Sequence, residues 1–167
     1  MCGICGIVYS NCDKQVDHDV LGLMSKSLLH RGPDSNDSWY GRGIGFSHRR
    51  LTILDITSAS NQPMVDNQTG VVITYNGEIY NYIEIRKKLT NKGHTFTSTG
   101  DTEVLLKAYI EWKYDLLMQV NGMFAFSIYD PRDDTVFFAR DPFGQKPLFY
   151  YYYEEGVIFS SELNSLL

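Results

Sequence analysis

Residues 123–140 read MFAFSIYDPRDDTVFFAR and indicate two short strands joined by a tight turn. Apolar and aromatic residues fill Met123–Tyr129 and Thr135–Ala139, and the segment between them is rich in turn-forming residues. Because so short a connection cannot carry a parallel crossover, the two strands must run antiparallel. Two further runs, Leu148–Tyr153 and Val157–Phe159, are separated by a similarly short turn. The second half of the chain is therefore predicted to be an antiparallel meander.

The remainder of the chain adds strands and helices. Apolar runs bounded by turn residues predict strands over Gly3–Tyr9, Trp39–Ser47 and Val71–Tyr75. Apolar residues that recur every three or four positions predict helices over Asp17–Leu29, Tyr82–Leu89 and Asp101–Trp112. Helices that lie before and between runs of antiparallel strands predict a layered α+β fold, and they exclude a doubly wound parallel sheet.

The composition is that of one globular domain spanning residues 1–167. Hydrophobic residues make up 43% and charged residues 21%, which excludes a disordered tail and a disulfide-dense miniprotein. The net charge of -5 argues against a nucleic-acid partner. No run approaches the ~18 apolar residues of a membrane span, and the N-terminus lacks a signal-peptide pattern. All three cysteines lie within the first twelve residues, which favours a reduced, cytoplasmic protein.

Cys2 directly follows Met1, and a side chain this small normally allows the methionine to be removed. Removal would give Cys2 a free α-amine with a pKa of about 7.7–8.0 beside a thiol with a pKa of about 8.5. One residue can then carry both a nucleophile and its base. Two other interpretations stay open: a small buried residue of the first strand, or a redox or metal motif formed with Cys5, Cys12 and His18.

Three further positions each allow a structural and a functional interpretation. Asn76-Gly77 is typical of a type I′ hairpin turn, and its side-chain amide and backbone N–H can also form an oxyanion hole. Asp101 suits the positive end of a helix, and Arg50 suits a strand edge. If both line one pocket, Arg50 fits the α-carboxylate and Asp101 the α-ammonium group of a free amino acid.

A series of motifs covers nearly the whole chain in one order. They are Met1–Ile7, His30–Asp34, Arg50–Asp55, Asn61–Met64, Asn76–Asn81, Gly100–Leu106, Gly122–Phe126, Arg140–Gly144 and Ser160–Leu163. Together they resemble the N-terminal glutaminase domain of glutamine-hydrolysing asparagine synthetases. That family belongs to the class II glutamine amidotransferases, which are N-terminal-nucleophile hydrolases.

The resemblance implies a four-layer αββα sandwich of two antiparallel sheets and an enzyme that hydrolyses L-glutamine. Cys2 corresponds to the nucleophile, with its α-amine as the base. Asn76 and Gly77 resemble the oxyanion hole. The residues that resemble the glutamine-binding positions are Arg50, Ile53, Glu78 and Asp101. The His30–Asp34 segment resembles a loop at the border of the site, and we assign no chemical role to it.

The resemblance also bears on cofactors and partners. It implies no metal or cofactor for this half, whereas ATP and Mg²⁺ are expected in a C-terminal synthetase domain that receives the ammonia and amidates aspartate. The chain stops at Leu167 and contains no Gly-Gly-x-Asp-Ser motif, so we expect that domain elsewhere, in the same or another chain. The last elements of the glutaminase domain are also expected to be missing, and a homodimer is compatible with the resemblance. Two alternatives remain: a catalytically silent glutamine-binding or assembly domain of the same fold, and a C-x-x-C redox or metal module.

Overall fold

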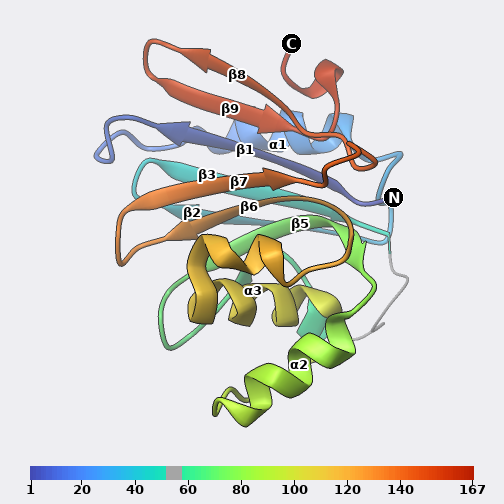
Figure 1. The fold of residues 1–167 in the computed structure, drawn as a ribbon. Helices are drawn as coiled ribbons and strands as arrows, with labels where there is room; N and C mark the ends of the chain where they lie inside the picture. Colours follow the sequence, from blue (N-terminus) through green and yellow to red (C-terminus); the bar gives the residue numbers. More distant parts are fainter. Residues whose placement is uncertain (52–57) are drawn as a thin grey trace.

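The computed structural model describes residues 1–51 and 58–167. Within these residues, nine strands form two antiparallel sheets, one with the order β2-β3-β1-β9-β8 and the other with the order β4-β5-β6-β7 (Figure 1). The strands are β1 Gly3–Tyr9, β2 Ser35–Gly41, β3 Ile44–Arg50, β4 Met64–Val65, β5 Val72–Ile79, β6 Gly122–Asp130, β7 Thr135–Arg140, β8 Phe149–Tyr153 and β9 Gly156–Ser160. The helices are α1 His18–Ser27, α2 Tyr82–Asn91 and α3 Asp101–Trp112, with short 3₁₀ turns η1 Ser58–Ser60, η2 Lys113–Met118 and η3 Leu163–Ser165.

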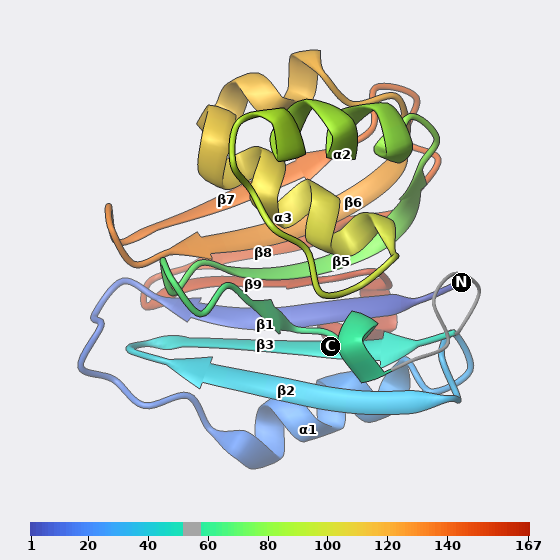
Figure 2. The same cartoon turned by 90° about the horizontal axis from the view of Figure 1, so that it is seen from below.

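The two sheets stack face to face between helices. Helix α1 covers the outer face of the five-stranded sheet, and α2 and α3 lie on the other side of the molecule, against the four-stranded sheet (Figures 1 and 2). The predicted α+β fold of four layers is therefore confirmed. No helix in the described part of the chain is long and apolar enough to cross a membrane.

Alternation along the strands divides the apolar side chains among three cores. In β1, Ile4 packs between the sheets, whereas Cys5 and Ile7 pack beneath α1. Helix α1 begins after Asp17, whose carboxylate accepts hydrogen bonds from two backbone N–H groups of the first turn. The third core lies between the four-stranded sheet and α2 and α3, where Ile85 is fully buried. Sequence periodicity predicts the buried face of α1 only in part, because Leu21 and Met24 are buried whereas Val20 is exposed.

Two strand predictions in the first half of the chain are wrong in detail. Trp39–Ser47 is not one strand, because a hairpin turn at Arg42-Gly43 separates β2 from β3. Gly43 has a φ of +67°, and a Cβ there would lie 2.9 Å from the Cα of Cys12. Asn76-Gly77 is not a turn, because β5 continues through it to Ile79 and pairs both residues with β6. Pairing with β6 decides this segment, because Ala125 and Phe124 lie opposite Asn76 and Gly77 and the strand continues past the turn signal.

The predicted meander is also wrong in part. The β6–β7 and β8–β9 hairpins form as expected, but they lie in different sheets. The loop of residues 141–148 carries the chain from one sheet to the other. Each turn determines only its own hairpin, so the sequence pattern contained no information on which sheet each hairpin joins.

A candidate active site around Cys2

A cavity of about 100 Å³ lies where the N-terminus meets the end of β3, the middle of β5 and the start of α3. Its lining includes six of the seven predicted site residues, namely Cys2, Arg50, Asn76, Gly77, Glu78 and Asp101. The seventh, Ile53, lies outside the described residues. The fold therefore brings together residues that are spread over about a hundred positions of sequence.

Cys2 lies just before β1, and the backbone of Leu51 holds its sulfur. The Leu51 N–H donates to Sγ at 3.4 Å, and the thiol donates to the Leu51 carbonyl oxygen at 3.6 Å. Burial raises the pKa of the Cys2 thiol, while the Leu51 backbone, the N-terminal charge, Arg50 and Lys146 act in the opposite direction. Because the net effect is an increase, the thiol needs a base to become a nucleophile at neutral pH.

Asn76 and Gly77 face this cavity from the middle of β5. Asn76 is 2% exposed, and its Nδ2 has no hydrogen-bond partner among the described residues. An unpaired buried donor costs about 1–3 kcal/mol, so its position here indicates an acceptor on a ligand. At Gly77 a Cβ would lie 2.4 Å from the Met123 carbonyl oxygen, and so no side chain can cover the backbone there. The pair has the composition of an oxyanion hole.

Arg50 and Asp101 supply opposite charges to the same cavity. Arg50 ends β3, and its Nη1 donates to Oδ1 of Asn61 at 2.7 Å. Asp101 begins α3, and its Oδ2 accepts hydrogen bonds from the Tyr75 hydroxyl at 2.7 Å and the Ile79 N–H at 2.9 Å. Burial raises the pKa of Asp101, and these two donors oppose that effect. A guanidinium and a carboxylate in one pocket match the two charges of an amino acid.

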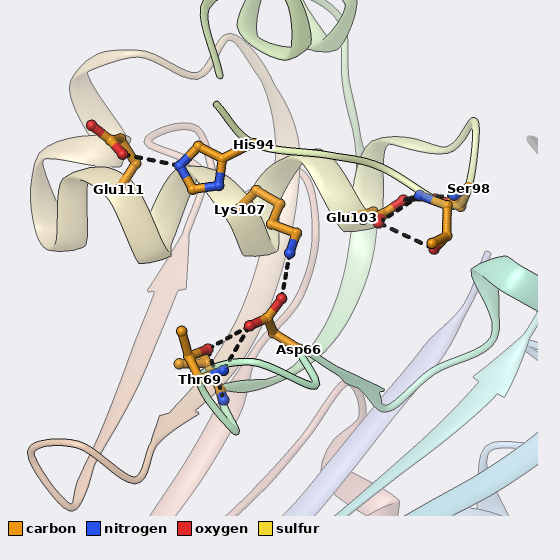
Figure 3. Close-up of polar contacts among 9 residues, drawn as sticks. Asp66, Thr69, His94, Ser98, Glu103, Lys107 and Glu111 are labelled. Atoms are coloured by element: carbon orange, nitrogen blue, oxygen red, sulfur yellow. Dashed lines mark hydrogen bonds and ion pairs between the residues drawn. The ribbon is translucent and has the colours of Figure 1, made fainter. Parts of the chain in front are cut away.

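Helix α3 and the loop before it are held by the polar contacts in Figure 3. Glu103 accepts hydrogen bonds from the backbone N–H groups of Thr97 and Ser98 and from both of their hydroxyls. Lys107 forms an ion pair with Asp66, which joins the turn after β4 to α3. One turn further along α3, Glu111 Oε2 lies 2.9 Å from His94 Nε2. The contacts of Glu103 fix the N-terminal turn of α3, which carries Asp101, and the other two fix its middle and its C-terminal end.

Sequence reasoning missed two residues that position the site. Gln62 accepts a hydrogen bond from the Tyr75 N–H at 2.6 Å and donates to Thr102 Oγ1 at 3.2 Å, so it links β5 to α3. Arg31 donates from Nε to the Cys2 carbonyl oxygen at 3.0 Å. Both belong to motifs to which no role was assigned, Asn61–Met64 and His30–Asp34. Their membership of these motifs was the signal that could have identified them. Their contacts join segments far apart in the chain, and such contacts are not visible in the sequence.

Two further buried groups line the cavity. His48 is 2% exposed, and burial lowers its pKa to about 3, so its imidazole is neutral at physiological pH. Lys146 is also buried, and its Nζ lies 3.3 Å from Sδ of Met1. Met1 lines the same cavity as Cys2.

The structure separates the thiols of the C-x-x-C motif. Cys2 lines the cavity, whereas Cys5 is fully buried on the opposite face of the sheet beneath α1. Burial raises the pKa of Cys5 to about 12, so this thiol is unreactive. Over residues 1–51 and 58–167, no three His, Cys, Asp or Glu side chains are grouped so as to hold a metal ion. The redox and metal interpretations therefore gain no support from the geometry.

Known proteins resemble this chain along its full length. It is 40% identical to asparagine synthetase [glutamine-hydrolyzing] 1 of Bacillus subtilis, with 100% of this chain and 27% of that protein covered. It is 38% identical to a putative asparagine synthetase [glutamine-hydrolyzing] 2 of Methanocaldococcus jannaschii, with 100% and 35% covered. The chain thus spans between about a quarter and a third of the length of these relatives.

A solved structure supports the fold, and a family comparison gives the classification. Glutamine phosphoribosylpyrophosphate amidotransferase of B. subtilis superposes with a TM-score of 0.79 at 20% identity, over 98% of this chain and 42% of that one. Residues 1–167 match the family described as glutamine amidotransferase domain. This chain therefore belongs to the glutamine amidotransferase domain family, in the branch that resembles glutamine-hydrolysing asparagine synthetases.

Proposed function

We propose that this chain hydrolyses L-glutamine to glutamate and ammonia, with Cys2 as the nucleophile once Met1 has been removed. One observation carries the proposal. The cavity holds the Cys2 thiol, the unpaired amide donor of Asn76, and the opposite charges of Arg50 and Asp101. The names of the relatives, which include the words glutamine-hydrolyzing, support the same substrate.

Each group has one task in the proposed reaction. Arg50 binds the α-carboxylate of glutamine, Asp101 binds its α-ammonium group, and Glu78 lines the rim. Ile53 remains a predicted part of the pocket. With the substrate held at its amino-acid end, the side-chain amide is directed toward Cys2. Such positioning converts a bimolecular attack into an effectively unimolecular one.

The chemistry proceeds through a thioester. The α-amine of Cys2 takes the thiol proton, directly or through a water, and the thiolate attacks the amide carbon. The Asn76 side-chain amide and the Gly77 N–H stabilise the tetrahedral oxyanion. The protonated amine then gives its proton to the leaving nitrogen, and ammonia departs. Water hydrolyses the thioester to glutamate and returns the enzyme to its starting state. Every step uses groups of this chain, the substrate and water, so we propose that this half requires no cofactor.

The relatives support a proposal for the ammonia acceptor. Because the chain spans only 27–35% of their length, we propose that a synthetase domain receives the ammonia, in the same or another chain. That domain would amidate aspartate with ATP and Mg²⁺. The free cysteines are typical of a reducing compartment, which supports a cytoplasmic location. A homodimer remains compatible with this arrangement.

The test is glutamate release by the purified protein, compared between the wild type, Cys2→Ala and the control Cys12→Ala. We expect the wild type and Cys12→Ala to release glutamate at equal rates and Cys2→Ala to release none. Glutamine binding without turnover in the wild type, measured by calorimetry, would instead support the silent glutamine-binding domain. Turnover that survives in Cys2→Ala would exclude the thioester mechanism.

A further inference from the structure

Lys146 is a buried cation beside the nucleophile, and it takes no part in the steps of the reaction proposed above. Its side chain lines the Cys2 cavity, and the residue is 7% exposed. No carboxylate of the described residues forms an ion pair with it, and within that part of the chain its Nζ has one hydrogen-bond partner, Sδ of Met1, at 3.3 Å. A buried charge without a counterion is costly, so the position of this lysine in the cavity indicates a function.

The loop between β7 and β8 is built to hold this lysine in place. Asp141 accepts hydrogen bonds from the N–H groups of Gln145 and Lys146, both at 2.9 Å. Arg140 donates from Nε to the Lys146 carbonyl oxygen at 2.8 Å. Gly144, with a φ of +64°, allows the tight bend between them. The backbone of Lys146 is therefore fixed from both sides, and its side chain enters the cavity at a defined point.

Several charged or titratable groups from other elements face the same space. They are His48 and Arg50 from β3, Tyr75 and Glu78 from β5, and Asp101 from α3. Arg31, from the loop after α1, binds the Cys2 carbonyl oxygen but does not line the cavity. His48 is neutral, and Asp101 is already bound to Tyr75 and Ile79. Lys146 is the cation in contact with Met1, the residue that precedes the nitrogen of Cys2.

We propose, on the basis of the function proposed above, that Lys146 is a positioning residue whose charge keeps the α-amine of Cys2 unprotonated and supports the Cys2 thiolate. When Met1 is removed, the Lys146 ammonium group faces the space beside the new N-terminus. A nearby positive charge disfavours the protonated amine and favours the ionised thiol. The resting enzyme thus keeps a free base at neutral pH. After the amine has taken the thiol proton, the same repulsion makes it a stronger acid toward the departing nitrogen.

The first test is the pH profile of kcat/KM for glutamine hydrolysis in Lys146→Met, Lys146→Gln and Lys146→Arg. Lys87→Met, on the exposed face of α2, is the matched control. We expect the acidic limb to move to higher pH by about one pH unit in the Met and Gln variants, with activity recovered at alkaline pH. The Arg and Lys87→Met variants should keep the wild-type limb. The proposal would be overturned if the acidic limb stayed at the wild-type pH. It would also be overturned if kcat/KM fell by the same factor at every pH with a raised KM.

A second readout does not depend on glutamine turnover. Alkylation of Cys2 by iodoacetamide, measured against pH by mass spectrometry of the N-terminal peptide in a Cys12→Ser background, reports the thiolate directly. We expect its midpoint to rise in Lys146→Met and Lys146→Gln. A raised midpoint in a protein that does not turn over glutamine would leave the Lys146 proposal standing and reject the proposed function. Glutamine turnover with an unchanged alkylation midpoint would reject the Lys146 proposal and leave the proposed function standing. Circular dichroism identifies any variant that fails to fold, and the folded Lys146 variants then test the proposal.

Discussion

The hydroxyl of Tyr75 lies 2.7 Å from Oδ2 of Asp101 and joins the middle of β5 to the first turn of α3. Burial and the negative charge of Asp101 raise the pKa of Tyr75 well above its ordinary value, so the phenol stays protonated and donates. The same carboxylate oxygen accepts the Ile79 N–H. The strand that carries Asn76 therefore also orients the carboxylate that we propose as the binding group for the substrate amine.

Tyr75→Phe should weaken glutamine binding more than it slows the chemical step. The substitution removes a hydrogen bond to a buried carboxylate, which is worth about 1.5–3 kcal/mol. We expect KM for glutamine to rise roughly tenfold with kcat changed less than threefold, following the conversion of about 1.4 kcal/mol to a factor of ten. Tyr109→Phe makes the same chemical change at a buried residue of α3 itself and should leave KM unaltered. A lowered kcat at constant KM would place Tyr75 in the chemical step instead.

Asn76→Ala should act on kcat. Loss of one oxyanion donor costs about 10²–10³ in rate, while ground-state binding is preserved. Stability should change little, because Nδ2 has no partner in the described structure. Asn81→Ala is the contrasting variant, since Asn81 donates to the Gln119 carbonyl and accepts the Asn121 N–H. It should lower stability without slowing turnover. Steady-state kinetics and urea unfolding of both variants separate the two effects.

His48 should impose a pH dependence on stability. Its pKa is about 3 in the folded protein because of burial, against about 6.5 in an unfolded chain. Above pH 6.5 both states are neutral, so His48 contributes no dependence there. As the pH falls from 6.5 toward 3, only the unfolded state takes up the proton, and the free energy of unfolding drops by about 1.4 kcal/mol per pH unit from this group.

Urea unfolding between pH 7 and pH 4.5 tests this expectation. His48→Gln should remove the part of the slope that His48 contributes, whereas His18→Gln, at an exposed position, should retain it. Equal slopes in the wild type and His48→Gln would show that His48 is not held neutral by burial.

The sequence predicts those helices and hairpins that are determined by residues close together in the chain. The β6–β7 hairpin follows from its turn, and α3 follows from the periodicity of its apolar residues. The sequence failed where distant segments compete. The choice of sheet for β8 and the continuation of β5 through Asn76-Gly77 depend on pairing with segments far along the chain. The turn at Arg42-Gly43 is instead a local signal, and the prediction of one strand over Trp39–Ser47 overlooked it.

The same distinction applies to the site. Cys2, Arg50, Asn76 and Asp101 were identified from motifs and resemblance, and the structure places them in one cavity. The contributions of Gln62, Arg31 and Lys146 could not be predicted. Each acts through a contact with a residue at least a dozen positions away, and side-chain identity alone does not reveal such a contact.

The central claim is that an N-terminal Cys2 forms a thioester with glutamine. The most direct measurement mixes the purified protein with glutamine, quenches the mixture in acid within its turnover time, and weighs the N-terminal peptide by mass spectrometry. The account predicts a peptide that begins at Cys2, a fraction of which carries a glutamyl group, and no adduct in Cys2→Ala. Glutamate formed by a protein that retains Met1, or glutamate formed with the adduct on another residue, would contradict it.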